Sequence, residues 1–145
     1  MDQVETPKGK SPDERLMERI MKVVNLNLSN PELTSELIAQ EVGMSRVHLY
    51  RKLRELTNQT ARNFIYNIRL AKAAELLAQK KCSVTEVAEM VGFTNASNFA
   101  SMFKRMYGVS PSTYMDEHVK KNVIVKPLTD EDFDSESAKD DHLMP

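Results

Sequence analysis

Residues 38–49 read IAQEVGMSRVHL and residues 87–99 read VAEMVGFTNASNF, so one pattern occurs twice in a chain of 145 residues. The first positions of the two stretches align with an offset of 49, and the positions from Leu49 onward align with an offset of 50. The second copy therefore has one additional residue in the turn Phe93-Thr94-Asn95. We infer that the chain contains two copies of one structural unit.

Each copy predicts a short helix, a turn that contains a glycine, and a second helix that ends at Asn58 or Gly108. The glycine allows the chain to reverse, and an alanine in each first helix allows the second helix to cross closely. Asn and Gly also tolerate the left-handed conformation that follows many helices. The pattern is typical of a helix-turn-helix, at about residues 33–58 (unit one) and again at about residues 83–108 (unit two).

The other segments are also helical by pattern. Ser11-Pro12-Asp13-Glu14 is a capping box with proline at the first helical position, and it predicts a leading helix that ends near residues 25–28. The longest predicted helix covers about residues 61–79 and has an apolar side that includes Ala71. No segment alternates as a strand does, so we expect an all-α fold of about seven helices, with two helix-turn-helix subdomains joined by a long central helix. The later helices are expected to begin at caps at Thr34, Ser45, Thr60, Ser83, Thr94 or Asn95, and Ser110.

The two ends differ in composition from the region between them. Residues 1–10 are polar and predict a linker or a disordered lead-in, residues 11–115 form the expected domain, and residues 116–145 predict an acidic, mostly disordered tail. No apolar stretch approaches the roughly 20 residues of a membrane-spanning helix, and the N-terminus lacks the pattern of a secretory signal. We therefore expect a cytoplasmic protein segment that does not insert into membranes.

The composition argues against the common catalytic and cofactor sites. Cys82 is the single cysteine, the three histidines are dispersed, and the four glycines form no phosphate-binding loop. The sequence shows no acid/base pair, no nucleophile with a partner and no metal-ligand set. We expect no enzymatic activity, no cofactor and no metal.

Charge is distributed unevenly along the chain. The net charge is −1, but residues 45–81 carry nine basic and two acidic side chains, whereas residues 115–145 carry four basic and nine acidic ones. A basic segment within a helix-turn-helix favours double-stranded DNA as the partner. The acidic tail leaves three interpretations open: inert disorder, a segment that binds a partner, or a competitor for the basic surface.

The second helices of the two units are expected to present different surfaces. With Leu49 and Leu53 inward, the outward surface of unit one is basic and aromatic, whereas the equivalent surface of unit two is small and polar. A central helix of 19 residues would be roughly 28 Å long, which is similar to the roughly 34 Å between major-groove segments on one side of B-DNA. One monomer could then reach two groove segments.

These motifs resemble the AraC/XylS family of bacterial transcription regulators, over about residues 33–114. Unit two carries the resemblance through Glu86-Val87-Ala88, Val91-Gly92-Phe93, Asn98-Phe99, Phe103-Lys104, Gly108-Val109-Ser110-Pro111 and Tyr114, and unit one carries it through Met44-Ser45-Arg46, Leu49, Arg51-Lys52-Leu53, Phe64 and Arg69-Leu70.

The resemblance implies that each unit inserts its second helix into the major groove to regulate transcription. Within the family the chain is most similar to the output domains at the C-terminus of hybrid two-component sensor proteins. RNA polymerase and a receiver or sensor domain of the same protein are then implied partners. The alternative from another class is an all-α protein-interaction module that does not bind DNA.

The resemblance also implies roles for individual residues. Unit two has shorter side chains than the family tends to carry, so we expect it to read bases more weakly than unit one. His48 is expected at the helix start near a phosphate. The implied base-facing residues are Arg46, Val47, Tyr50 and Arg51 in unit one and Ala96, Ser97, Asn98 and Ser101 in unit two, and Arg54, Lys104 and Arg105 are implied near phosphates.

Overall fold

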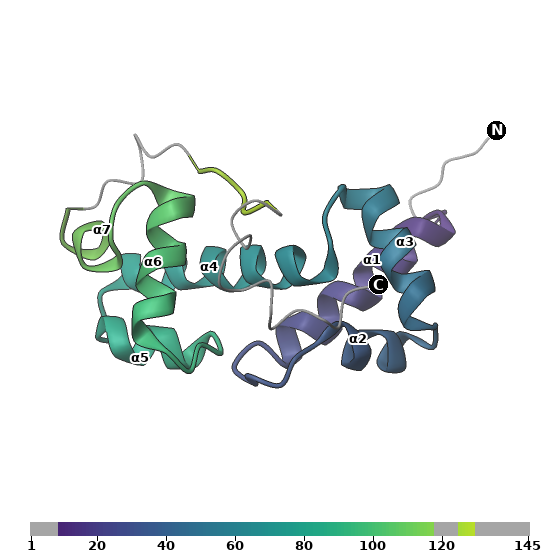
Figure 1. The fold of residues 1–145 in the computed structure, drawn as a ribbon, viewed down its shortest axis with the longest axis horizontal. Helices are drawn as coiled ribbons and strands as arrows, with labels where there is room; N and C mark the ends of the chain where they lie inside the picture. The colour runs from purple at the N-terminus through teal and green to yellow at the C-terminus, as the bar shows by residue number, and fades with distance from the viewer. Residues whose placement is uncertain (1–8, 118–124, 130–145) are drawn as a thin grey trace.

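The computed structural model describes residues 9–117 and 125–129, which form seven α-helices and no strand (Figure 1). This confirms the predicted all-α fold with two helix-turn-helix subdomains and a long central helix. The expectations for residues 1–8, 118–124 and 130–145 lie outside the described residues. The helices are α1 (Pro12–Leu26), α2 (Ser35–Val42), α3 (Arg46–Thr57), α4 (Ala61–Gln79), α5 (Val84–Met90), α6 (Ala96–Tyr107) and α7 (Pro111–Glu117).

The first six helices begin at side-chain caps, as the sequence predicted. At α1, the hydroxyl of Ser11 accepts a hydrogen bond from the Glu14 amide at 3.1 Å, and the Glu14 carboxylate accepts one from the Ser11 amide at 2.9 Å. Asn95, rather than Thr94, caps α6. Thr94 is therefore the additional residue of unit two, and it lengthens the turn between α5 and α6 without shifting the register of either helix.

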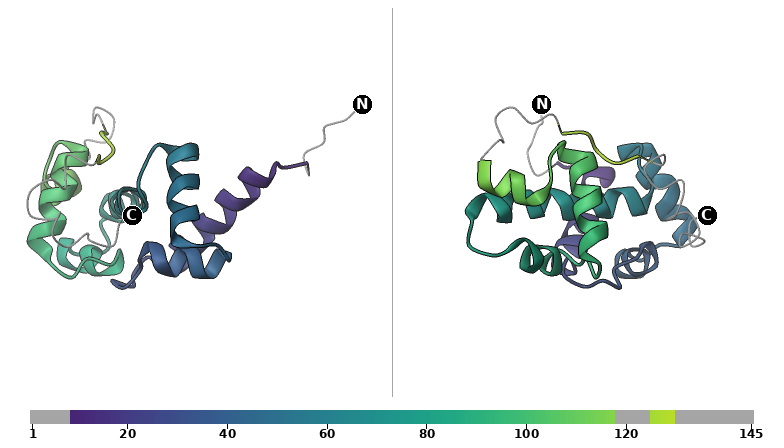
Figure 2. Two further views of the ribbon diagram at one scale, coloured as in Figure 1. Left: turned by 45° about the vertical axis from the view of Figure 1, so that its right-hand side comes forward. Right: turned by 60° about the vertical axis from the view of Figure 1, so that its left-hand side comes forward.

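The long helix α4 joins the two units (Figures 1 and 2). Unit one contains α2 and α3, and α1 packs against α2; unit two contains α5 and α6, and α7 packs against both α4 and α6. In Figure 1 and in the left view of Figure 2, α3 and α6 run in the same direction at opposite ends of α4. The second helices of the two units therefore have matching orientations.

The buried surface of α4 is wider than the single apolar side predicted from its sequence. Ala71 is exposed, so its predicted burial is wrong, whereas Leu70 and Ala73 are fully buried. The reason is that α4 contacts α3 on the side of unit one and α5, α6 and α7 on the side of unit two. A helix packed between two bodies buries parts of more than one face.

A joint between the two units lies on α4 at Arg69. This side chain is only 5% exposed, and its Nη2 donates a hydrogen bond to the carbonyl oxygen of Asn30, in the loop between α1 and α2, at 2.7 Å. Gly92, in the turn of unit two, has φ +91° and no room for a side chain, because a Cβ there would overlap the carbonyl oxygen of Leu28 and lie 2.8 Å from Cζ of Arg69. The turn of unit two therefore packs directly on the loop that precedes unit one.

Residues 125–129, which we call the strap, form a second connection. The strap lies in the segment whose composition suggested disorder, yet Leu128 is only 2% exposed and belongs to the core. The amide of Lys126 donates a hydrogen bond to the carbonyl oxygen of Met106, at the end of α6, at 2.8 Å. Leu128 is held by Asn67 of α4, whose Oδ1 accepts from the Leu128 amide at 2.7 Å.

Candidate nucleic-acid interface

The cap of α3 and the core of unit one set which side chains of α3 reach solvent. Ser45 caps the helix by accepting a hydrogen bond from the His48 amide at 3.0 Å. Leu49 and Leu53 are fully buried, so the opposite side of α3 faces outward. The structure places Val47, His48 and Arg51 on this exposed side, with Tyr50 and Arg54 half-buried at its border.

Arg46, at the start of α3, forms an ion pair with Glu36 of α2. Its Nη1 lies 2.8 Å from Oε2 of Glu36, and the two side chains remain 36% and 62% exposed. An ion pair this open to water is weak, typically contributing about 0–1 kcal/mol, so it positions Arg46 without holding it away from a phosphate or base. Sequence periodicity does not reveal this pair, because its members lie on different helices.

Arg51 is the most available cation of α3. It is exposed and makes no ion pair or side-chain hydrogen bond with the part of the chain that the structure describes. The neighbouring Lys52 turns toward α1 instead, where its Nζ lies 2.9 Å from a carboxylate oxygen of Asp13. The hydrogen bond that Lys52 donates to the Asp13 carboxylate raises the pKa of Lys52 above its ordinary value. Adjacent cations of α3 therefore have different surroundings, one facing solvent and one facing α1.

The equivalent side of α6 carries almost no charge over its first two turns. The Asn95 side chain accepts a hydrogen bond from the Asn98 amide at 2.8 Å, and Phe99 and Phe103 are fully buried. The exposed positions are Ala96, Ser97, Asn98 and Ser101, and charge appears only in the last turn, at Lys104 and Arg105. Cations in a last helical turn also offset the helix dipole, so these two have a structural role as well.

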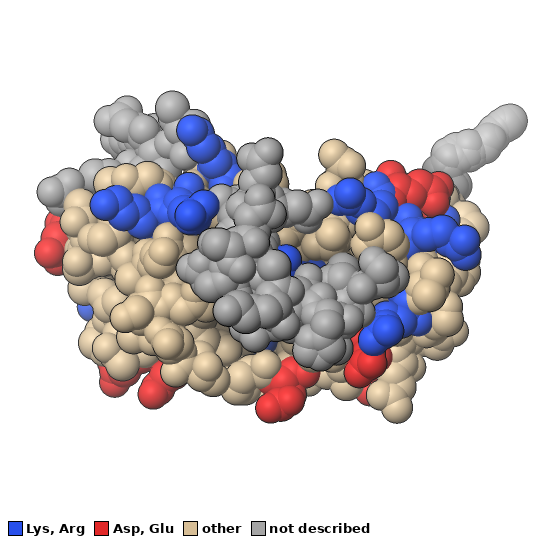
Figure 3. All heavy atoms as spheres, viewed as in Figure 1, with Lys and Arg blue, Asp and Glu red and all other residues tan. Residues whose placement is uncertain are grey.

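The two outward surfaces lie on one side of the molecule. Lys and Arg side chains gather over α3 and over the upper end of α6 in Figure 3, and most acidic side chains in this view lie along the lower edge. The structure thus brings the predicted residues of each unit together within that unit and holds the two groups apart on α4.

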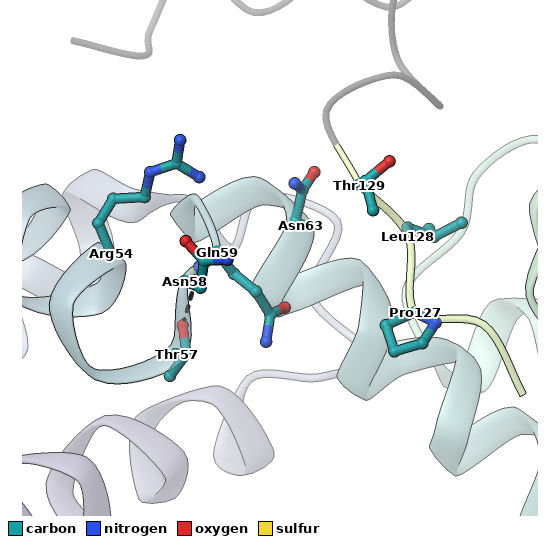
Figure 4. Close-up of a pocket in the computed structure, with 8 residues that line it drawn as sticks. All are labelled: Arg54, Thr57, Asn58, Gln59, Asn63, Pro127, Leu128 and Thr129. Atoms are coloured by element: carbon teal, nitrogen blue, oxygen red, sulfur yellow. Dashed lines mark hydrogen bonds between the residues drawn. The ribbon is translucent and has the colours of Figure 1, made fainter.

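A groove of about 580 Å³ lies between the end of α3 and the strap (Figure 4). Thr57, Asn58 and Gln59 lie on one side and residues 127–129 on the other, with Asn63 between them. Sequence reasoning did not assign a role to Asn67 or Leu128, which join the two sides. The contact between them spans 61 positions, and no local pattern indicates it.

Residues 9–117 and 125–129 offer neither a cluster of metal ligands nor a membrane-spanning helix. No group of three or more His, Cys, Asp or Glu side chains in this part of the chain is arranged to hold a metal ion. No helix in it is long and apolar enough to cross a membrane.

The chain matches a known family and resembles known proteins. A family model described as "Helix-turn-helix domain" matches residues 38–117. Histidine kinase P4 of Formosa agariphila is 33% identical over 108 residues, which are 74% of this chain and 8% of that protein. The chain spans only 8–58% of the lengths of the first five curated relatives that it matches.

Solved structures also resemble this fold. The C-terminal domain of AraT, a response regulator from Geobacillus stearothermophilus, is 28% identical with a TM-score of 0.64, and the match covers 83% of this chain and 93% of that one. The DNA-binding domain of AdpA, described as a global transcriptional factor and solved in complex with a target DNA, is 27% identical with a TM-score of 0.65. That match covers 74% of this chain and 95% of the AdpA domain.

Proposed function

The chain belongs to the AraC/XylS family of helix-turn-helix DNA-binding transcription regulators, a family of DNA-binding domains and not of enzymes, and from this we propose that its α3 and α6 enter successive major-groove segments of one duplex. The observation that carries the proposal is the matching orientation of the two helices at opposite ends of α4 (Figure 1). A 19-residue helix is about 28 Å long, which is close to one turn of B-DNA.

In this proposal the two units contribute differently to recognition. Arg51 reads a base edge, because an exposed arginine reaching a guanine is the commonest specific contact in a major groove. Arg46, at the start of α3, also faces a base, and His48 beside it lies near a phosphate, which a helix N-terminus favours. The further base-facing residues are Val47 and Tyr50 of α3 and Ala96, Ser97, Asn98 and Ser101 of α6, and the phosphate contacts are Arg54, Lys104 and Arg105.

We also propose that the chain is the output domain of a signalling protein. The support lies in the relatives, since one is named a histidine kinase and another is a response regulator's C-terminal domain. A receiver or sensor domain would then control it, and RNA polymerase would be its partner at a promoter. The proposed action on RNA polymerase is tested by in vitro transcription, with and without the protein, from a promoter that carries a duplex sequence the protein binds.

Selection of bound sequences from a random duplex library, followed by footprinting, tests the main proposal. We expect one monomer to protect two segments about one helical turn apart on one side of the duplex. The logarithm of the binding constant should fall linearly with the logarithm of salt concentration, because phosphate contacts release counterions. A single protected segment would contradict the two-groove arrangement, and failure to select any duplex would favour a protein-interaction module that does not bind DNA.

A further inference from the structure

We propose that the strap, residues 125–129, is a clamp that sets the spacing and orientation of α3 and α6, with Asn67 and Leu128 as its positioning residues. The inference rests on the proposed function, since it concerns how two recognition helices meet one duplex. No residue of the clamp needs to touch a base. Its effect is on which spacing of two groove segments the protein accepts.

The strap holds unit two at the end of its recognition helix. The Met106 carbonyl oxygen, which accepts from the Lys126 amide at 2.8 Å, belongs to the last turn of α6. Carbonyl groups in the last turn of a helix have no partner within that helix. The strap therefore provides a hydrogen-bond donor for a carbonyl group that has no partner within α6. This bond attaches the C-terminal end of α6 to the strap.

The strap also contacts α4 at Asn67, and through Asn67 it is linked to Gln59 in the loop between α3 and α4. Asn67 accepts from the Leu128 amide at 2.7 Å, and its Nδ2 lies 3.4 Å from the Leu128 carbonyl oxygen. That Nδ2 also donates to Oε1 of Gln59, between α3 and α4, at 2.8 Å. Because Leu128 is also buried in the core, hydrogen bonds and apolar packing fix the strap at one point.

The clamp and the Arg69 joint act on opposite sides of α4. Asn67 and Arg69 are two positions apart, and two positions correspond to about 200° around an α-helix. Asn67 engages the strap, whereas Arg69 engages the loop at Asn30 and the turn at Gly92. Connections on opposite sides of one rod resist bending between the two units in both directions, which a single connection does not do.

A fixed geometry matters because the two units bind one duplex together. When two binding elements are linked rigidly at the correct separation, the second binds at a high effective concentration. A looser link lowers this concentration and accepts other spacings, but it leaves the affinity of each element for its own segment unchanged. Loosening the clamp should therefore lower the affinity only for DNA that carries both segments.

The test compares Leu128→Ser and Asn67→Ala with the wild-type chain and with Val125→Ser. Val125 is a matched control, because it lies in the strap but is 45% exposed. Fluorescence anisotropy would measure binding to the selected duplex, to duplexes with either segment randomised, and to duplexes with one or two base pairs inserted between the segments. We expect both clamp variants to bind the intact duplex with about tenfold lower affinity than the wild-type chain. Their affinity for a duplex with a single segment should fall by less than about twofold. The loss of affinity caused by the inserted base pairs should also be smaller in both variants than in the wild-type chain.

The possible outcomes separate this inference from the proposed function. If the wild-type chain binds single-segment and intact duplexes equally, the two-groove proposal fails, and the clamp inference fails with it. If the wild-type chain prefers the intact duplex but the clamp variants match it, only the clamp is wrong. Equal losses on single-segment and intact duplexes would also overturn the clamp, because they would show that the strap merely stabilises one unit. Retained binding to single segments shows that the variants are folded.

Discussion

α3 and α6 occupy equivalent places in two copies of one unit, yet they share little apart from their backbone. Each has 12 residues, begins at a side-chain cap and ends at a residue with positive φ. The buried positions of α3 are leucines, whereas those of α6 include Phe99, Phe103 and Tyr107. Phe103 stacks on Tyr107, and both rings meet Tyr114 of α7 edge to face. The outward side is cationic in α3 and small and polar in α6. A duplicated scaffold can therefore keep its geometry while its core and its surface chemistry diverge independently.

The largest predicted effect is on stability, and it compares the cores of the two units. Phe103→Ala should lower the free energy of unfolding by about 3–5 kcal/mol, and Leu53→Ala, at the equivalent position, by about 2–5 kcal/mol. Phe103 contacts three aromatic rings with centroids 4.6–5.8 Å away, so its removal leaves a cavity that rigid neighbours fill poorly. Denaturant titrations followed by circular dichroism would measure both losses. A loss below about 1 kcal/mol at Phe103 would contradict its central place in unit two.

The second prediction concerns the two surfaces. Arg51→Ala should weaken specific DNA binding by about 1–3 kcal/mol and relax preference at one base position, whereas Ser101→Ala should change affinity by less than about twofold. Anisotropy titrations on the selected duplex and on random DNA would measure both. Equal losses on random DNA would assign Arg51 to a phosphate, and a tenfold loss at Ser101 would mean that unit two reads bases as strongly as unit one.

The third prediction uses alkaline pH to separate the two cores. Burial raises the pKa of Tyr107 to about 12 from an ordinary value of 10.0. The folded state therefore favours the neutral phenol, so this contribution to stability is complete below pH 10 and is lost as the pH rises through about 12. We expect a loss of about 1–2 kcal/mol across this interval. Tyr107→Phe should reduce this pH dependence in thermal melts, and an unchanged slope would contradict the assignment.

The smallest effect concerns the ion pair at the start of α3. Glu36→Gln removes the carboxylate beside Arg46 but keeps the size of the side chain, so Arg46 no longer gives up a weak ion pair when it meets DNA. Because exposed ion pairs are weak, affinity for the selected duplex should rise by only about two- to threefold. Glu89→Gln is a suitable control, because Glu89 is an exposed acid of unit two. A fall in affinity would show that Glu36 orients Arg46 for DNA.

The predictable parts of the fold were those that depend on neighbouring residues. The caps at Ser45, Thr60 and Ser83 act within three residues of themselves, and the one-residue difference in offset located the longer turn of unit two. The exposure of Ala71 was not predicted, because periodicity does not indicate how many bodies a helix packs against. The contact of Asn67 with Leu128 joins distant parts of the chain, so no local pattern could reveal it.

The candidate interface was predictable to a similar extent. Burial of Leu49 and Leu53 determines which side of α3 faces outward, and this follows from the repeat alone. The pairing of Arg46 with Glu36 and of Lys52 with Asp13 was not visible in the sequence, because each pair joins two helices whose relative placement is a tertiary property. The DNA-contacting roles of the individual residues stay predictions until the variants above are measured.

α1 is attached to the two units unequally. Asp13, in its first turn, pairs with Lys52 of α3, and the guanidinium of Arg19 donates to the carbonyl oxygen of Val42, at the end of α2, at 2.8 Å. Unit two meets this region at the loop after α1, where Gly92 packs on the carbonyl oxygen of Leu28 beside the hydrogen bond from Arg69 of α4 to Asn30. α1 is therefore joined by side-chain contacts to both helices of unit one, so the cationic helix α3 is buttressed from outside its own unit.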